Sequence, residues 1–250
     1  MNKLTDRVIF KSDFCEAQCR QMYELYQKYY GGTNWSLFRE DLTRKHCAIL
    51  LLDRSQVLRG FTTLEIIDFE WENQPRRALF SGDTIIDRPY WGEQTLPLAW
   101  CRLAGQIKAE LPHLPLYWFL IVKGYRTYRY LPVFAKSFYP TWRYPTPDSI
   151  RALMDYLATL KFGDNYRPET GLVQFPESRG HLSETWAEIK PGYRQKPDVR
   201  YFLERNPNYD RGDELVCLME LTEENMRSHA KRGFVEGIQS ADPRLKTSAS

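Results

Sequence analysis

The sequence lacks several patterns that would indicate common classes of protein. Its five cysteines form no Cys-x-x-Cys pair and no Cys/His ligand spacing, so we expect neither a disulfide framework nor a metal site. No run of about 18 apolar residues occurs, which argues against a membrane-spanning helix. The N-terminus also lacks the apolar core of a signal peptide. We therefore expect a cytoplasmic protein, and peripheral membrane contact stays open.

The chain also has little net charge and few histidines. Its 35 basic and 32 acidic residues leave +3, too little to indicate nucleic acid as the default partner. The four histidines stand in no setting typical of a hydrolase. Aromatic residues, by contrast, make up 14% of the chain, including 16 tyrosines and 7 tryptophans. Such a composition favours a cleft for an apolar or ring-bearing ligand.

Residues 78–94, ALFSGDTIIDRPYWGEQ, run from a β-rich segment through a Pro/Gly turn into a helical segment. The first free N–H groups of a helix, with the positive end of its dipole, form an anion site. Gly92 would let the backbone approach a bulky anion closely. The loop therefore predicts a site for a phosphate ester, such as a nucleotide, coenzyme A or pantetheine phosphate.

Hydrophobic periodicity and turn residues outline the other elements. We expect helices within residues 14–30, 35–45, 95–110, 125–140, 148–162 and 222–232, and strands within 46–53, 57–71, 78–87, 115–124 and 214–221. The strand at 115–124 is apolar on both faces, as in a strand covered on both sides. Residues 72–77 are expected to interrupt the β structure.

Residues 111–147 contain no acidic side chain. Lys123, Arg126, Arg129, Lys136 and Arg143 all lie in this stretch, beside the strand at 115–124. We expect this positive charge to attract an anionic donor or partner.

This order of elements resembles the fold of the GCN5-related N-acetyltransferases (GNAT) over residues 7–142. DRPYWGEQ resembles the family's strand end followed by Q/R-x-x-G-x-G/A, and FAKSFYPTW resembles its Y-x-K-x-G-F. The resemblance implies an α/β (α+β) fold: a mixed, largely antiparallel central sheet with a splayed strand pair, flanked by helices. Residues 1–142 would form the acyltransferase core, 143–235 a C-terminal extension packed on it, and 236–250 a disordered tail.

The departures from the family pattern indicate one branch of it. Gln94 stands where a second small residue is usual, and the loop before Gly92 is one residue short. These departures leave the loop less closely fitted to the pyrophosphate of coenzyme A. In this respect the chain is similar to autoinducer and N-acyl amino acid synthases, the long-chain N-acyltransferase branch. The implied reaction moves an acyl group, here a fatty acyl, from acyl-CoA or acyl carrier protein to a primary amine of a small molecule or peptide.

The resemblance also implies where the chemistry takes place. A pantetheine arm would lie between strands 78–87 and 116–123, and a backbone N–H within residues 84–86 would stabilise the oxyanion. A carboxylate must accept the proton of the amine, with Glu65 the first choice and Asp83 the second. Phe134 occupies the position of the family's tyrosine acid, so Tyr130 or Tyr128 would replace it.

The donor acts as a co-substrate, and no cofactor is bound permanently. The residues expected to contact the donor belong to the loop and to the basic stretch: Ile85, Ile86, Arg88, Trp91, Gly92, Glu93, Gln94, Lys123, Arg126 and Arg129. Aromatic residues around the acyl end would form a pocket longer than acetyl needs, and they are Trp91, Trp100, Tyr117, Trp118, Phe119, Phe134 and Phe138.

Two alternatives come from other classes of protein. A non-catalytic module of the same fold would bind pantetheine or a peptide without acyl transfer, consistent with Phe134 and Gln94. A nucleic-acid binder would use the interleaved basic and aromatic residues of KGYRTYRY, residues 123–130. The short length of that stretch argues against a nucleic-acid partner.

Overall fold

The computed structural model describes residues 4–177, 179–189 and 191–240, and within them eight strands form one mixed sheet. The strands are β1 (Thr5–Phe10), β3 (Cys47–Leu52), β4 (Leu58–Trp71), β5 (Gln74–Ile86), β6 (Leu116–Val122), β7 (Tyr166–Arg167), β8 (Leu172–Val173) and β10 (Glu214–Glu220). Their order is β1-β3-β4-β5-β6-β10-β8-β7. All neighbours are antiparallel except β5 and β6, which run parallel. Two further strands, β2 (Tyr30–Gly31) and β9 (His181–Leu182), pair with each other.

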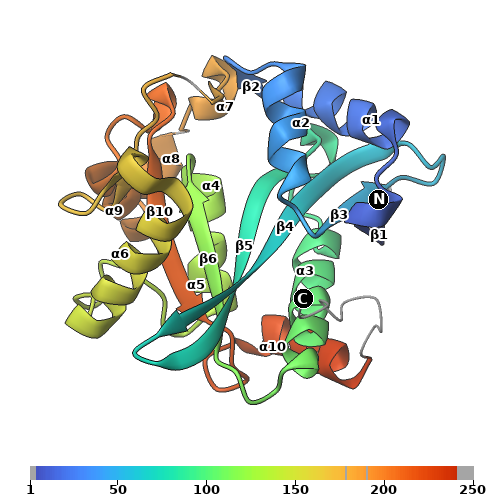
Figure 1. Cartoon of the computed structure of the whole chain (residues 1–250). Helices are drawn as coiled ribbons and strands as arrows, with labels where there is room; N and C mark the ends of the chain where they lie inside the picture. Colours follow the sequence, from blue (N-terminus) through green and yellow to red (C-terminus); the bar gives the residue numbers. More distant parts are fainter. Residues whose placement is uncertain (1–3, 178, 190, 241–250) are drawn as a thin grey trace.

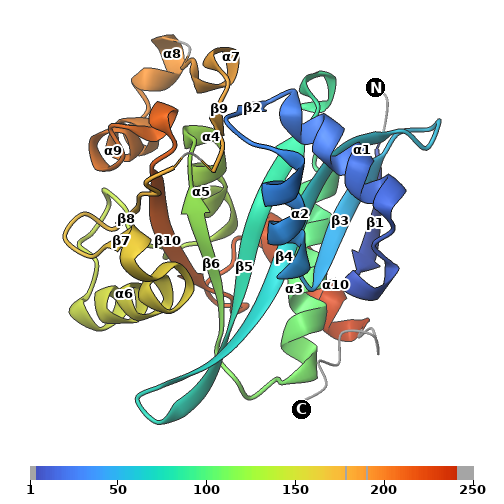
Figure 2. The ribbon, with the colours of Figure 1, turned by 45° about the horizontal axis from the view of Figure 1, so that its top comes forward.

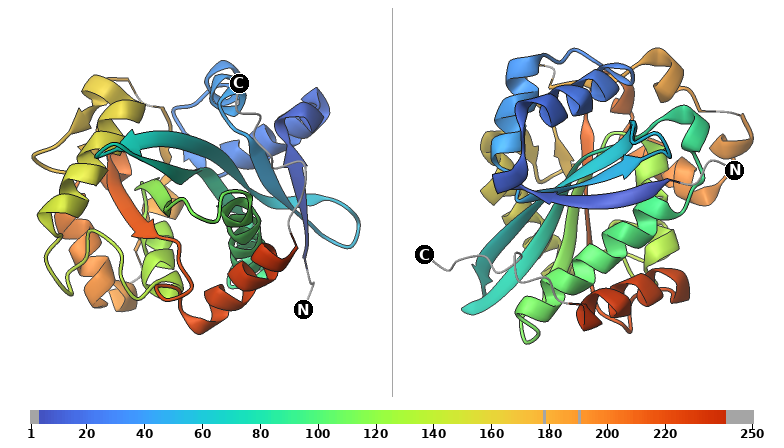
Figure 3. Two further views of the ribbon diagram at one scale, coloured as in Figure 1. Left: turned by 60° about the horizontal axis from the view of Figure 1, so that its bottom comes forward. Right: turned by 90° about the vertical axis from the view of Figure 1, so that its right-hand side faces the viewer.

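Helices flank this sheet (Figure 1). They are α1 (Glu16–Gln27), α2 (Trp35–Thr43), α3 (Thr95–Glu110), α4 (Tyr125–Tyr128), α5 (Tyr130–Phe134), α6 (Asp148–Phe162), α7 (Glu184–Ala187), α8 (Pro191–Arg194), α9 (Pro197–Arg205) and α10 (Ser228–Gln239). Figure 3 shows α1 and α2 on one face of the sheet and α3 beside α10 on the other. The expected mixed, largely antiparallel sheet flanked by helices is therefore confirmed.

The first elements show where local sequence was informative. Asn34 caps α2, because its Oδ1 accepts a hydrogen bond from the backbone N–H of Leu37 at 2.9 Å. The helix expected within 14–30 is α1, which spans Glu16–Gln27, and a short 3-10 turn over Lys11–Asp13 precedes it. The strand β1 was not predicted. Its six residues, TDRVIF, place three polar side chains before three apolar ones, so the period-two alternation that marks a half-buried strand is missing.

The expected interruption at residues 72–77 is wrong in its extent. Glu72 and Asn73 alone form the turn, with φ of 53° and 58°. Positive φ at two successive residues is the geometry of the type I′ turn that joins tight hairpins. As a result β4 and β5 pair from Trp71 and Gln74 onward, and β5 begins four residues before the predicted position.

The two parallel strands separate after a short ladder. Residues 77–81 of β5 pair with residues 116–120 of β6, and Ser81 opposite Leu120 is the last pair. Beyond it, β5 stays paired with β4 as far as Ile86, whereas β6 stays paired with β10. Each strand thus follows a different neighbour, and Figure 2 shows the two moving apart toward β2 and α4.

A bulge accompanies this separation. Leu64 of β4 faces Ser81, while Thr62 faces Thr84, so Gly82 and Asp83 together stand opposite a single β4 residue. An extra residue of this kind bends the strand and increases its twist. The bulge therefore lies at the point where β5 loses β6 as a partner.

The C-terminal part of the chain belongs to the same sheet. β10 pairs with β6 from Leu215 to Glu220, and α10 lies against α3. The helix expected at 222–232 is displaced, since α10 spans Ser228–Gln239. Of the tail expected to be disordered, residues 236–239 are helical, and residues 241–250 lie outside the described ones. The division of the chain at residue 142 stays a prediction.

Glycines let α10 pack directly on α3. A Cβ on Gly105 of α3 would lie 2.0 Å from the carbonyl oxygen of Phe234, and one on Gly237 of α10 would lie 1.9 Å from that of Arg102. Backbone atoms cannot move aside as a flexible side chain can. The distance between these two helices is therefore set by the absence of side chains at both positions.

Gly105→Ala and Gly237→Ala should each destabilise the protein, because the added methyl group forces α10 away from α3. We expect the free energy of unfolding in urea to fall by about 1–3 kcal/mol or more. Gly192→Ala is the matched control, since a Cβ there would meet no atom within 4 Å. Equal unfolding midpoints for all three variants would contradict this account of the packing.

Candidate active site

A cavity of about 630 Å³ opens where β5 and β6 separate. Gly82, Asp83 and Thr84 of β5 line it from one side, and Ile121 and Lys123, at the end of β6, line it from the other. Residues of α1, α2, α6 and the segment around β9 complete the wall. The cavity therefore depends on segments from the whole length of the chain.

Asp83 is the carboxylate of β5 that faces this cavity. Removal from water, together with the negative charge of Asp41, raises the pKa of Asp83 to about 7, although Lys123 and Lys45 oppose the shift. A carboxylate with such a pKa exchanges its proton near neutral pH. This property is typical of groups that act as general bases or acids.

Lys123 and Glu214 form an ion pair beside Asp83. The Lys123 Nζ lies 3.3 Å from Glu214 Oε1, and both side chains are largely buried. Burial raises the pKa of Glu214, and Lys123 opposes that shift. Lys123 was expected to belong to a basic group without compensating acids, and this expectation is wrong because β10 supplies its partner.

Glu65, the preferred base in the sequence analysis, lies in a different setting. Its Oε2 is 2.7 Å from the Nζ of Lys161 and 3.8 Å from that of Lys45. The buried Lys45 also pairs with Asp41 at 2.9 Å. Among the residues described as lining the cavity, both lysines are present and Glu65 is not. The position favours Asp83 over Glu65 as the group that meets a ligand.

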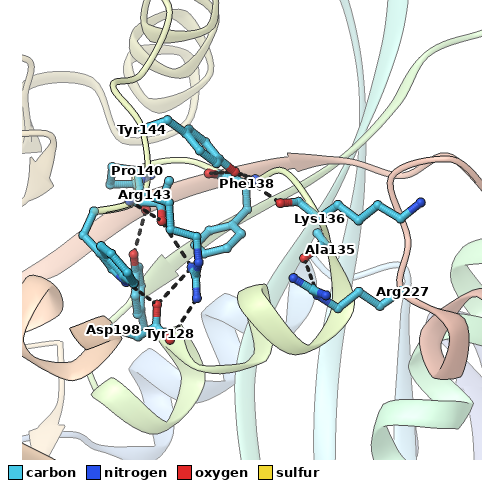
Figure 4. Close-up of polar contacts among 11 residues, drawn as sticks. Tyr128, Ala135, Lys136, Phe138, Pro140, Arg143, Tyr144, Asp198 and Arg227 are labelled. Carbon is cyan, nitrogen blue, oxygen red and sulfur yellow. Dashed lines mark hydrogen bonds and ion pairs between the residues drawn. The ribbon is translucent and has the colours of Figure 1, made fainter. Parts of the chain in front are cut away.

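Tyr130 lines the cavity, whereas Tyr128 is fully buried and lies outside its described lining. The hydroxyl of Tyr128 donates to the carbonyl oxygen of Pro140 at 2.8 Å (Figure 4), and burial raises its pKa far above the usual range. The contact lies next to the ion pair of Arg143 with Asp198, which joins the loop after α5 to α9 (Figure 4). Tyr128 thus holds the loop after α5. Tyr130 is half-buried, and this burial raises its pKa.

Only part of the loop before α3 lines the cavity. Gly92, with φ of +89°, and Trp91 line it, and a Cβ on Gly92 would meet no protein atom within 4 Å. Glu93 turns elsewhere, since its carboxylate accepts hydrogen bonds from the N–H of Leu4 and the hydroxyl of Thr95. An acidic side chain therefore lies beside the first turn of α3, where we expected a phosphate.

Of the other loop residues expected to contact a donor, one lines the cavity and three do not. Ile86 lines it. Ile85 is buried under α1 and α2, Arg88 is exposed, and the Gln94 side chain donates to the carbonyl oxygen of Gly92. These last three lie outside the described lining of the cavity.

Arg126 and Arg129 line the mouth of the cavity among aromatic rings. The guanidinium of Arg126 lies 4.8 Å from the ring centre of Trp91 and 5.3 Å from that of Trp186, and it donates to the carbonyl oxygen of Trp186 at 2.7 Å. Arg129 lies 5.1 Å from the ring of Tyr193. Sequence reasoning missed Trp186 and Tyr193, because nothing in a loop-rich segment marks which residues reach the site.

A second, smaller cavity of about 40 Å³ lies on the α3 side of the same gap. Trp100, Trp118 and Phe134 line it and also pack on one another, with ring centres 4.5 to 5.9 Å apart. The other aromatic residues expected around an acyl chain lie apart from it: Trp91 at the mouth of the larger cavity, and Tyr117, Phe119 and Phe138 buried in the core.

The described residues contain no group of three or more side chains suited to hold a metal ion. Their helices also include none with the length and apolarity needed to cross a membrane. His46 has a structural contact, because its Nδ1 accepts the backbone N–H of Ile66 at 3.0 Å.

The raised pKa of Asp83 predicts how stability depends on pH. Between about pH 4 and 7 the unfolded chain loses the Asp83 proton first, so the free energy of unfolding should fall as pH rises. Asp83→Asn removes this contribution, and its stability relative to wild type should increase across that window, measured by urea unfolding. Asp164→Asn, on an exposed turn, is the control. If the difference in unfolding free energy between Asp83→Asn and wild type changes no more with pH than that of Asp164→Asn, the raised pKa of Asp83 is contradicted.

Comparisons with known proteins find solved structures of limited similarity. No family model and no curated protein matches the chain. One structure is described as a probable N-acyltransferase from Enterococcus faecalis V583 (TM-score 0.39, 14% identity, 54% of this chain and 33% of that one). Another is the GNAT family N-acetyltransferase YhbS from Escherichia coli in complex with CoA (TM-score 0.36, 10% identity, 49% of this chain and 64% of that one). A third is AtaT complexed with acetyl-methionyl-tRNAfMet (TM-score 0.35, 14% identity, 51% of this chain and 83% of that one).

The chain thus spans a third of the first of these proteins and less than two thirds of the second. All three TM-scores are below 0.5. The fold assignment therefore depends on the sheet topology described above, with its single parallel and separating pair of strands.

Proposed function

We propose that this protein is an N-acyltransferase that moves an acyl group from a thioester to a primary amine. The observation that carries the proposal is Asp83, a carboxylate with a pKa raised to about 7, in a cavity at the separating ends of β5 and β6. A gap between two strands exposes backbone groups that can pair with the amides of a pantetheine arm. The resemblance to the GNAT family, stated from the sequence, agrees with this arrangement.

In the proposed reaction Asp83 is the general base. A primary amine is protonated at neutral pH and first gives one proton to water, so that its nitrogen can attack. The nitrogen forms a bond to the thioester carbonyl carbon, the carbon–sulfur bond breaks, and the amine proton goes to the Asp83 carboxylate directly or through water. Tyr130, on the same cavity, is the candidate that protonates the departing thiolate.

Several charged and aromatic groups favour an amine as the acceptor. Asp83 lines the cavity, and so do Tyr26 and Tyr30, which stack with ring centres 4.5 Å apart. The other carboxylate there, Glu214, is paired with Lys123. A carboxylate and an aromatic face attract a cationic ammonium group and hold the amine beside Asp83.

The donor is proposed to be acyl-CoA or an acyl carrier protein, which share the pantetheine thioester. At the mouth of the cavity, Arg126 and Arg129 supply positive charge, and Trp91 and Trp186 supply flat apolar surface. A phosphate carried by either donor suits the arginines. The free space beside Gly92 allows the backbone to approach such a group closely.

We further propose that the acyl group transferred is a fatty acyl group. The cavity of about 40 Å³ beside Trp100 and Trp118 is too small for a long chain, so the chain would have to occupy the cavity of about 630 Å³. Phe80, Phe162 and Phe175 contribute apolar surface there. Each methylene buried against them contributes about 0.8 kcal/mol.

Acyl transfer should be measured as release of free thiol from acetyl-, octanoyl- and palmitoyl-CoA and from the matching acyl carrier proteins, with mixed primary amines. We expect transfer by the wild type, with longer chains preferred to acetyl. Asp83→Asn should lower kcat/KM by about 10²- to 10⁴-fold, the range typical of a general base. The rate of the wild type should rise with pH up to about 7, where Asp83 becomes ionised.

Glu65→Gln is the control that separates the two candidate bases, since Glu65 faces Lys161 and Lys45. A full rate for Asp83→Asn would exclude Asp83 as the base. Preference for acetyl would exclude the fatty-acyl form. Binding of the donor without any transfer would favour a non-catalytic pantetheine- or peptide-binding module.

Gly92→Val tests the loop before α3. The side chain would enter open space, so it should obstruct an incoming phosphate without a clash inside the protein, although the positive φ adds some strain. We expect donor affinity to fall at least tenfold, measured by calorimetry with CoA. Gly171→Val is the control, because Gly171 also has a positive φ and lies outside the described lining of the cavity, and a Cβ there would meet only the Arg205 side chain, at 3.7 Å. Equal affinity in both variants would remove the phosphate site from the proposal.

A further inference from the structure

Ser81 lies at the fork of the two separating strands. It is the last β5 residue paired with β6, and its side chain is only 7% exposed. The residue lines both the larger cavity and the smaller one on the α3 side. A hydroxyl group is therefore buried at the point where a ligand between β5 and β6 would reach farthest into the sheet.

Two tryptophans donate hydrogen bonds to this single hydroxyl. The indole Nε1 of Trp118 lies 2.9 Å from Ser81 Oγ, and that of Trp100 lies 3.1 Å from it. An indole N–H can only donate, and a serine oxygen has two lone pairs. Both lone pairs of Ser81 are thus engaged, and the group retains one capacity, to donate its own O–H.

Within the described residues, the Ser81 hydroxyl makes two hydrogen bonds, and it is the acceptor in both. Its own O–H therefore has no acceptor among these residues. A buried O–H without an acceptor is unfavourable, so a water or ligand atom in the adjoining space completes it. The smaller cavity beside Ser81 and Gly82 offers about 40 Å³ for such an atom. Two accepted bonds also polarise the hydroxyl and strengthen it as a donor.

We propose that the Ser81 hydroxyl donates a hydrogen bond to the carbonyl oxygen of the donor thioester and stabilises the oxyanion that forms during transfer. When the amine nitrogen bonds to the carbonyl carbon, the carbonyl π electrons move to oxygen, where Ser81 holds the charge. When the carbonyl double bond reforms, the thiolate leaves, and the amine proton goes to Asp83. Ser81 forms no covalent bond. This inference rests on the proposed acyl transfer.

The same contacts argue against Ser81 as a nucleophile. Attack by Oγ would require one of the lone pairs that now accept the indole N–H groups, and both bonds are buried. A nucleophilic serine also needs a base to take its proton. The hydrogen bonds of Ser81 within the described residues connect it to neither a histidine nor a carboxylate.

Ser81→Ala tests the proposal with two readouts on the full-length protein. The first is kcat/KM for transfer from acetyl-CoA and octanoyl-CoA, which we expect to fall by about 10²- to 10³-fold, as when one oxyanion donor is removed. The second is the infrared carbonyl stretch of each thioester, labelled with ¹³C at the carbonyl and bound without acceptor. It should lie at lower frequency on the wild type than in solution and return toward the solution value on Ser81→Ala.

Trp118→Phe is the matched variant that keeps the hydroxyl and removes one indole donor. It should retain more activity than Ser81→Ala and give an intermediate carbonyl frequency, because Ser81 is less polarised. Near-ultraviolet circular dichroism checks that the aromatic cluster remains packed in both variants. A purely structural role for Ser81 would lower stability without changing the carbonyl frequency of the bound thioester.

The outcomes separate this inference from the proposed function. Transfer by the wild type with an unchanged rate and carbonyl frequency in Ser81→Ala overturns the role of Ser81 alone. A loss of rate that grows with the pKa of the leaving thiol, at constant carbonyl frequency, also overturns it, since Ser81 would then act on sulfur. A wild type that neither binds the labelled thioesters nor transfers their acyl groups overturns both proposals.

Discussion

The site depends on the point where β5 and β6 stop pairing. Up to Ser81 the two strands share a parallel ladder, and beyond it each keeps its other neighbour, β4 or β10. Because both outer ladders continue, the backbone of each strand remains held while the gap between them opens. The bulge at Gly82 and Asp83 bends β5 at this same place. The sheet itself thereby provides one side of the opening.

Charge inside this opening is kept in balance by pairing. Lys45 is 1% exposed, and it meets Asp41 and, more distantly, Glu65, which itself pairs with Lys161. Gly82 makes room for this group, since a Cβ there would lie 2.9 Å from the Lys45 Nζ. With most charges engaged in this way, Asp83 is left with a raised pKa, because loss of hydration outweighs the attraction of Lys123 and Lys45.

The sequence was sufficient for features that local patterns encode. The α3 boundaries and the apolar strand β6 follow from periodicity and turn residues. The separating strand pair was implied by the resemblance to the GNAT fold. The sequence also placed Asp83 and Tyr130 among the candidates, and both line the cavity. Local pattern could not rank Asp83 above Glu65, because the difference lies in Lys161, 96 residues away in the chain. Likewise Tyr128 and Tyr130 are two residues apart, and only packing shows that one of them is buried under a loop.

Residues beyond 142, which the resemblance to a known fold did not cover, complete the site. Glu214 begins β10, and it can reach Lys123 because β10 joins the sheet beside β6 with Leu215 opposite Val122. Trp186 meets Arg126 and Trp91 from a segment held against α1 by the pairing of β9 with β2. Without these contacts Lys123 would be a buried cation without a partner, and the mouth of the cavity would lose one wall. Residues beyond 142 therefore shape the cavity as much as β5 and β6 do.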